Sequence, residues 1–571
     1  MKINEAIQSE MYVKNLKRII LLSLIFSSLT LLVGRGNLSS HTHQFLDFAK
    51  SIASGQPTPS SGVRPCGYPL LIFISGYTKH GSMMMIYIIQ ALCGFGFPIL
   101  FYSFIGKKMP TVAFVSSLLL ILSMYPYQLV KLLTYDQIAN FLLLTCAWSV
   151  LNTLGCTKLS NLLSLGSITA FLANFKAANI LIPVIPIGIV SIFIQDSRKN
   201  RLIKVLTLTA ISIALTASLF LFTKQYRLKG SSYTGCQLFY GPYINSKKFG
   251  VDLTLNQGKA MKELSRKLQQ ALQESGKAKI DKFIKDANIN TEVAEDHFER
   301  FKPEDLCKIL LQNPKYLYFE FICHLLEFDN DTFLSAAKEI YYTHPDLVLK
   351  YFLFNLKIYF TDPGWRNFPN STRDNGYRKL PYLHELVIGG GGTNYRPDII
   401  SELAIKEVNI CPWESLKISK YVSPQPLRKC INYLSKKLID NCPVPLLVLN
   451  MVGIFAVIFK RDRYNLTLLT ITTSFIIYNA FVTCLIVEPE WFYKMSALPL
   501  ELAGATVGFY CISSSILNFR REKEPKIISM EDENVFACAL KSQKIEATQA
   551  CFLGGLVVST FAALQTILVF R

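Results

Sequence analysis

The sequence is poor in charged residues. Asp, Glu, Lys and Arg make up 18% of its 571 residues and half of the residues are hydrophobic, whereas soluble domains carry about 25% charged residues. The sequence also lacks a Cys/His cluster with the spacing of a zinc site, and no long internal repeat is visible. The glycine run 389–392 has no following Lys-Ser/Thr, so it is not a phosphate-binding loop. The composition favours a membrane protein.

Acidic residues are scarce relative to basic ones, which gives a net charge of +20. A basic surface can bind nucleic acid, but the Lys and Arg clusters here stand beside long apolar segments, as the positive-inside rule describes. Attraction to anionic lipid headgroups explains these clusters. We therefore expect membrane lipids, and no nucleic acid, as partners.

Apolar segments of about 20 residues recur in both halves of the chain, and this length crosses the hydrocarbon core of a bilayer. They predict a mainly α fold, a multi-pass transmembrane helical bundle of about eleven spans with a large, mostly helical exoplasmic domain. The predicted spans are 16–34, 82–105, 111–127, 135–155, 160–175, 177–195, 203–224, 443–459, 464–487, 495–516 and 548–570.

The basic loops predict the orientation. If the spans alternate, the clusters Arg198 to Lys204 and Arg520 to Lys526 lie on the same side as the N-terminus, and the positive-inside rule makes that side cytoplasmic. We expect the bacterial inner (plasma) membrane as the location. The predicted parts are an N-terminal transmembrane module 1–224 with a first outer loop 35–81, an exoplasmic domain 225–442, and a C-terminal transmembrane module 443–571 with a cytoplasmic loop 517–547.

The first outer loop carries candidate polar residues. Ser39 or Ser40 can cap a helix over about 41–54, and Gly55 would end it. His43 and Asp47 are four residues apart, so they share a face of that helix. The alternative is a surface helix whose aspartate is merely solvated.

Charged residues also lie at other predicted outer ends of spans. Asp136 stands at the mouth of the fourth span, where an ionisable residue is a functional candidate, although the helix dipole alone would favour a carboxylate there. Lys176 lies in a short outer turn and could equally snorkel. In the last outer hairpin, Glu490 and Lys494 lie at the level of headgroup phosphates, beside aromatic residues typical of a membrane interface.

Taken together, these segments resemble the C-class polytopic glycosyltransferases, the group that includes protein O-mannosyltransferases and lipid A aminoarabinose transferases. The first-loop pattern of that group is matched by Phe45, Ala49, Ile52, Gly55, Arg64, Gly67, Tyr68, Pro69 and Leu70. Its second outer-loop pattern is matched by Pro126, Thr134 and Asp136, a third motif by Gly166 to Lys176 with Lys for Arg, and its final hairpin by Trp491 to Pro499. The similar part covers roughly 15–245 and 440–515.

The resemblance implies an inverting transfer of a sugar from a polyprenyl-phosphate donor to a lipid, glycan or protein acceptor on the outer face of the membrane. Such a reaction needs a general base near the acceptor hydroxyl and cations on the leaving phosphate. Arg64, Lys176 and Lys494 would supply the cations, and Tyr68 and Glu490 are further substrate-binding candidates. Asp136 could hold a divalent metal, Mg or Mn.

One departure from the family pattern concerns the base. The catalytic aspartate of the first outer loop would fall at His41, where this chain has no acid. Either Asp47 or a histidine, His41 or His43, takes the role of the base, or the chain is a catalytically silent relative that serves as a membrane scaffold or assembly protein. A lipid or solute transporter is a further alternative, but few charges lie deep in the predicted spans.

Overall fold

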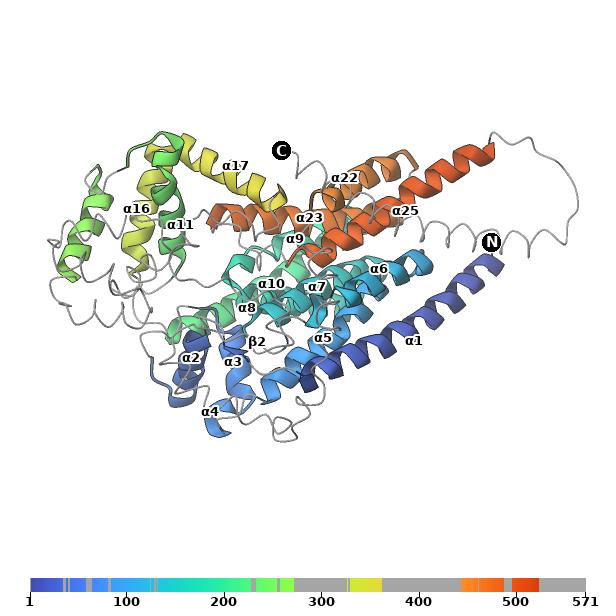
Figure 1. Cartoon of the computed structure of the whole chain (residues 1–571), viewed down its shortest axis with the longest axis horizontal. Helices are drawn as coiled ribbons and strands as arrows, with labels where there is room; N and C mark the ends of the chain where they lie inside the picture. Colours follow the sequence, from blue (N-terminus) through green and yellow to red (C-terminus); the bar gives the residue numbers. More distant parts are fainter. Residues whose placement is uncertain are drawn as a thin grey trace, which may run out of the picture.

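The protein is described by a computed structural model in which helices dominate (Figure 1). The described residues are 2–33, 37–38, 42–57, 64–80, 84–123, 125–127, 130, 132–226, 233–253, 257–271, 326, 329–361, 443–460, 462–486 and 496–522. Within them the only strands are two short ones, β1 (Asn37–Leu38) and β2 (Leu132–Leu133), which pair in parallel. The predicted mainly α fold is confirmed for this part of the chain.

Long helices form the body of the molecule. They are α1 (Lys2–Val33), α5 (Met84–Ile105), α6 (Pro110–Leu122), α7 (Asp136–Gly155), α8 (Leu159–Phe175), α9 (Val184–Phe193), α10 (Arg198–Gln225), α22 (Pro443–Lys460), α23 (Arg463–Ile486) and α25 (Leu498–Glu522). Every predicted apolar segment before residue 516 overlaps one of them, and the segment 548–570 lies outside the described residues.

Four of these helices, α5, α7, α10 and α23, are long and apolar enough to cross a membrane, and α6, α8 and α9 are shorter apolar helices. This finding is consistent with a membrane protein. It does not confirm the predicted number of eleven spans.

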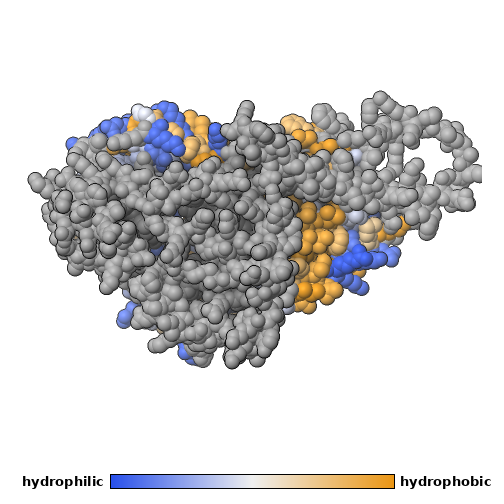
Figure 2. All heavy atoms as spheres, viewed as in Figure 1, coloured by the Kyte–Doolittle hydropathy of each residue, from blue (hydrophilic) through white to orange (hydrophobic). Residues whose placement is uncertain are grey.

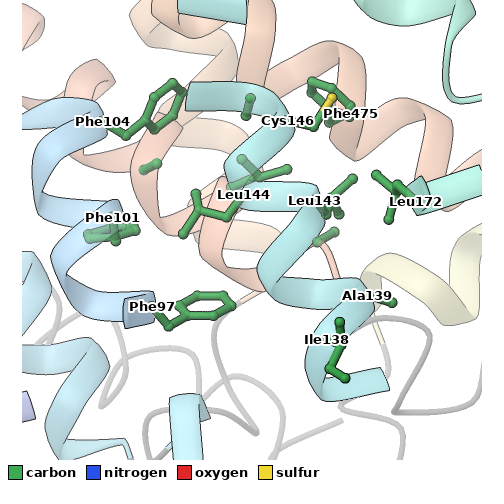
Figure 3. Close-up of a cluster of buried hydrophobic side chains, with 14 of the residues drawn as sticks. Phe97, Phe101, Phe104, Ile138, Ala139, Leu143, Leu144, Cys146, Leu172 and Phe475 are labelled. Atoms are coloured by element: carbon green, nitrogen blue, oxygen red, sulfur yellow. The ribbon is translucent and has the colours of Figure 1, made fainter. Parts of the chain in front are cut away.

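The core of the bundle is built around α7 (Figure 3). In this view Leu144 of α7 lies on the side of Phe97, Phe101 and Phe104 of α5, and Leu143 lies on the side of Leu172 of α8. Phe475 of α23 belongs to the same cluster, and all seven residues are at most 4% exposed. Close packing of this kind holds α7 between helices from both halves of the sequence.

The outside of the bundle is apolar as well. On α1 the exposed side chains include Leu21, Leu24 and Ile25, and α10 exposes a longer series of apolar residues, Leu202, Ile203, Leu206, Ile213, Leu215, Phe220 and Leu221. Figure 2 shows an apolar area beside hydrophilic residues in the region of α1. Exposed apolar surface of this extent is what a helix in contact with lipid presents.

Shorter helices gather at one end of the bundle (Figure 1). The first outer loop contributes α2 (Thr42–Ser54), α3 (Gly67–Ile74) and α4 (Tyr77–His80), and the long insertion contributes α11 (Tyr233–Asn245), the helical residues 259–271, α16 (Asn330–Thr343) and α17 (Pro345–Thr361). The end of the first-loop helix at Gly55 is confirmed: α2 ends before this residue, whose φ of 71° suits a glycine at a helix C-terminus. Helices α16 and α17 are separated at His344, because a residue before proline disfavours the α region.

Candidate functional site

A buried ion pair joins two of the residues singled out in the sequence. The ammonium Nζ of Lys176 lies 3.3 Å from Oδ1 of Asp136, and the two residues are 4% and 8% exposed. The other carboxylate oxygen, Oδ2, accepts a hydrogen bond of 2.8 Å from the hydroxyl of Thr134. Lys176 also donates to the hydroxyl of Ser496, at 3.3 Å. The pair therefore connects residues from three distant parts of the chain.

Local structure explains how these groups meet. Asp136 is the first residue of α7, where the helix dipole favours a carboxylate. Lys176 follows the last residue of α8 in extended conformation, and the chain then turns into a short 3-10 helix, Ala177–Asn179. The hydroxyl of Tyr478 in α23 donates to the carbonyl of Ala178 at 2.8 Å, which fixes this turn against the bundle.

Electrostatics make the two charges depend on each other. Burial lowers the pKa of Lys176, and the nearby carboxylate of Asp136 opposes that shift. The Tyr135 ring, with its centroid 6.0 Å from the Lys176 ammonium, offers a further weak attraction. Removal of either partner would leave an uncompensated buried charge, which is far more costly than loss of an exposed ion pair.

Residues of the first outer loop pack beside the ion pair. The Phe45 ring contacts the edges of Tyr135 and Tyr68, with centroids 5.4 and 5.1 Å away. The Tyr68 hydroxyl donates to Oε1 of Gln90 at 2.8 Å, and the Gln90 amide donates to the carbonyl of Val130 at 3.0 Å. An aromatic and polar network thus links the first outer loop, α5 and the segment before α7.

Gly67 shows why the first outer loop can approach so closely. A Cβ atom at this position would lie 2.7 Å from the carbonyl oxygen of Asn174, closer than real Cβ contacts come. The backbone of α3 therefore touches the end of α8, two residues before Lys176. A side chain at position 67 would push this loop away from the ion pair.

The other first-loop candidates are placed as follows. Arg64 is buried and its Nε donates to Oε1 of Gln44 on α2 at 2.8 Å. Asp47 is half-buried on the same helix. His43 lies in α2, four residues from Asp47, but its side chain is outside the described residues, as is the whole of His41. Their predicted roles stay predictions.

The last outer hairpin is described only at its end, by Ser496 and Ala497. Glu490 and Lys494 lie outside the described residues, so their predicted contacts with substrate stay predictions. Ser496 places the end of this hairpin beside Lys176.

A metal site at Asp136 is not built by the described residues. Nowhere among them do three His, Cys, Asp or Glu side chains come together as metal ligands would, and both oxygens of Asp136 already accept hydrogen bonds from Lys176 and Thr134. This arrangement does not fit the several oxygen ligands that Mg or Mn needs. The predicted metal stays a prediction, and no chemical step is derived from it.

Glu501 was missed in the sequence. It lies in the first turn of α25 and is 3% exposed, although it stands in an otherwise apolar stretch. A single acid within an apolar helix was the signal that could have revealed Glu501.

No family model matches the sequence, and no curated protein matches it. Among solved structures, the apo form of the Archaeoglobus fulgidus oligosaccharyltransferase is similar to this chain, with a TM-score of 0.37 and 11% sequence identity. The match covers 96% of this chain and 56% of the other, so the chain spans little more than half the length of that protein. A TM-score this low does not establish a shared fold.

Proposed function

We propose that this chain is a membrane glycosyltransferase that moves a sugar from a polyprenyl-phosphate donor to an acceptor on the outer face of the membrane, with inversion at the anomeric carbon. The observation that carries the proposal is the convergence on the ion pair of Lys176 and Asp136. Segments that resemble motifs of the C-class glycosyltransferases contribute Phe45, Tyr135 and Ser496 around it.

The leaving group explains the need for a buried cation. As the bond between the anomeric carbon and the phosphate oxygen breaks, negative charge grows on the lipid phosphate, and a cation in a dry site stabilises it far more than one in water. Lys176 is a buried ammonium held in place by Asp136. In the proposed reaction it donates to the departing phosphate, with Arg64 and Lys494 as further cationic candidates.

The acceptor side needs a base. A carboxylate or imidazole takes the proton of the acceptor hydroxyl while the oxygen attacks the anomeric carbon from the face opposite the phosphate. Asp47, half-buried on α2, and His43 and His41 are the candidates. A single displacement of this kind inverts the configuration, and the base keeps the proton when the lipid phosphate leaves.

The alternative is a catalytically silent scaffold. The absence of an acid at position 41 and the pairing of Lys176 with Asp136 favour it, because an ion pair of this kind can also be purely structural. Under this alternative the ion pair only holds the ends of α7, α8 and α25 together.

Transfer from a radiolabelled polyprenyl-phosphate sugar, measured in proteoliposomes, separates the two functions. We expect Asp136→Asn and Lys176→Gln to lower transfer by about 10²-fold or more, the usual effect of removing a charge-stabilising group. Asp196→Asn is the matched control, because it breaks another Lys–Asp pair, with Lys204, whose side chains are 25% and 23% exposed. Transfer that is undetectable in the wild type with every donor tried would favour the scaffold.

The base is tested by His43→Ala, Asp47→Asn and His41→Asp in the same assay. Loss of transfer in either of the first two identifies the base. Transfer that is seen only after His41→Asp would mean that the natural chain is silent, and the proposed enzyme would be wrong.

We propose the orientation on the basis of the basic loops: the N-terminus is cytoplasmic and 225–442 is exoplasmic, in the bacterial inner membrane. A cysteine introduced at Gln257 should react with a membrane-impermeant thiol reagent from outside intact cells. Reaction only after the cytoplasmic side is opened would reverse the orientation.

A further inference from the structure

Helix α17 lies against the outer half of a helix that is long and apolar enough to cross a membrane. The amide of Asn355 in α17 donates to the carbonyl of Cys484 in α23 at 3.1 Å, and the amide of Asn479 in α23 donates to the Tyr359 hydroxyl at 2.7 Å. Asn479 stands seven residues before Ile486, the end of α23. At 1.5 Å per residue this is about 10 Å along the helix axis.

Figure 1 shows the same relation, with the C-terminal part of α17 beside α23 and its N-terminal part near α11 and α16. Phe360 also packs against the main core of the bundle. The end of α17 therefore lies at the depth of the membrane-crossing helices, although the sequence places it within the long insertion.

The exposed side of α17 carries two leucines among its charged residues Asp346, Lys350 and Lys357. Its buried stripe, Leu347, Tyr351, Asn355 and Tyr359, repeats every four residues and carries three polar groups. On the opposite side, Leu349 and Leu353 are 57% and 52% exposed. A helix on a water-soluble domain turns its apolar face inward and its polar face outward. Two leucines this exposed, next to a buried stripe that carries polar groups, favour contact with lipid over contact with water.

The exposed leucines continue an apolar surface on α23. The Phe352 ring contacts the Phe481 ring, with centroids 5.3 Å apart, and Phe481 and Ile477 on α23 are 51% and 52% exposed. Figure 2 shows apolar residues at the surface in the region of α17. The two helices thus present one continuous apolar face.

Basic residues accompany this face. Lys350 is half exposed and pairs with Asp346 one turn before it, at 3.3 Å, and Lys357 is exposed one turn after Leu353. Long lysine side chains can follow an apolar surface and keep their ammonium groups at lipid headgroups. Their charge suits the phosphates of a bilayer surface.

We infer that α17 enters the bilayer from the end of the bundle that carries the candidate site, with Leu349 and Leu353 in contact with phospholipid acyl chains and with the side chains of Lys350 and Lys357 extending back toward the headgroups. The long insertion is then held to the membrane by its own helix as well as by the spans that flank it. This inference does not depend on the proposed transferase activity.

Photo-crosslinking tests the lipid contact in the full-length protein, reconstituted in nanodiscs of phosphatidylcholine and phosphatidylglycerol. Benzoylphenylalanine is introduced at Leu349 or Leu353, at Phe481 as a control facing lipid, and at Tyr342 as a control facing water, since Tyr342 is 84% exposed on α16. We expect lipid adducts at positions 349, 353 and 481 by mass spectrometry, and none at 342.

Two results would overturn the inference. Adducts at Phe481 without adducts at Leu349 and Leu353 would mean that the exposed stripe of α17 faces water. Adducts of these two positions with a peptide of this chain, or with a second copy, would mean that protein covers the stripe. Because the readout is the identity of the adduct, neither result depends on activity.

Discussion

Two Lys–Asp pairs in different surroundings show what separates a candidate site from a structural contact. The pair of Lys176 and Asp136 lies at the end of the bundle, with side chains 4% and 11% exposed and 3.3 Å between the charged atoms. The pair of Lys267 and Asp329 joins the helical residues 259–271 to α16, with side chains 35% and 26% exposed and a distance of 2.6 Å. Distance alone would rank the second pair as the stronger.

Burial reverses that ranking. Lys267 and Asp329 can each be hydrated if the other is lost, and exposed pairs contribute about 0–1 kcal/mol. Asp329 has a second role, because its Oδ1 accepts from the backbone N–H of Thr332 and caps α16. In the bundle, the side chains of Lys176 and Asp136 are only 4% and 11% exposed, so water would hydrate either of them poorly if the other were lost. Loss of one partner of the buried pair therefore costs much free energy of unfolding, and its buried charges could also act on a substrate. The half-exposed pair is explained by helix capping.

The largest expected effect is that of Lys176→Met. It leaves the Asp136 carboxylate buried without its cation, and such a loss costs about 3–5 kcal/mol of the free energy of unfolding. Reversible unfolding in mixed micelles measures it. The double variant Lys176→Met with Asp136→Leu is the control, and it should be more stable than the single variant because no buried charge remains. A single variant within about 1 kcal/mol of the wild type would contradict the role assigned to burial.

The corresponding change in the other pair, Lys267→Met, should cost about 0.2–1 kcal/mol, as for other exposed pairs. Its effect should also shrink as salt is added, because exposed charges are screened, whereas the effect of Lys176→Met should change little. Unfolding of both variants at low and high ionic strength makes this comparison. Equal salt dependence of the two variants would mean that the environments differ less than their burial indicates.

Local features of the fold could be predicted from the sequence. Apolar segments predicted the positions of the helices of the bundle, and Gly55 predicted the end of α2. Each of these depends on residues near one another in the chain. The number of membrane crossings depends on how each helix packs in the bundle. Among the described residues, length and composition identify only four helices that could cross a membrane.

The candidate site could be predicted in part. Asp136 and Lys176 were each recognised from their place at the ends of apolar segments, but their pairing spans 40 residues and is set by the packing of α7 against α8. Gln90 and Glu501 were missed because each is a single polar residue within an apolar helix, and its partners come from other segments. The catalytic and binding roles of all the candidates, His41, Glu490 and Lys494 included, stay predictions.

The smallest expected effect is the pH dependence of the stability that the pair of Lys267 and Asp329 contributes. Burial alone would raise the pKa of Asp329, but hydrogen bonds from Lys267, from the Thr332 hydroxyl and from the Thr332 N–H outweigh it, so the pKa lies below its ordinary value. The unfolded chain then binds a proton more readily than the folded one. The stabilisation is fully present above the unfolded pKa of about 4 and is lost as pH falls through the folded pKa.

Asp329→Asn isolates this contribution, because asparagine is also a good N-cap but carries no charge. We expect hydrogen exchange within α16 to be faster in the variant than in the wild type at about pH 7, and this difference to vanish as the folded pKa is passed on acidification. Exchange rates must be corrected for the intrinsic effect of pH, and a peptide from α10 serves as the internal reference. A difference that stays constant down to acid pH would mean that it does not come from the charge of the Asp329 carboxylate, and that the ion pair with Lys267 adds nothing to stability.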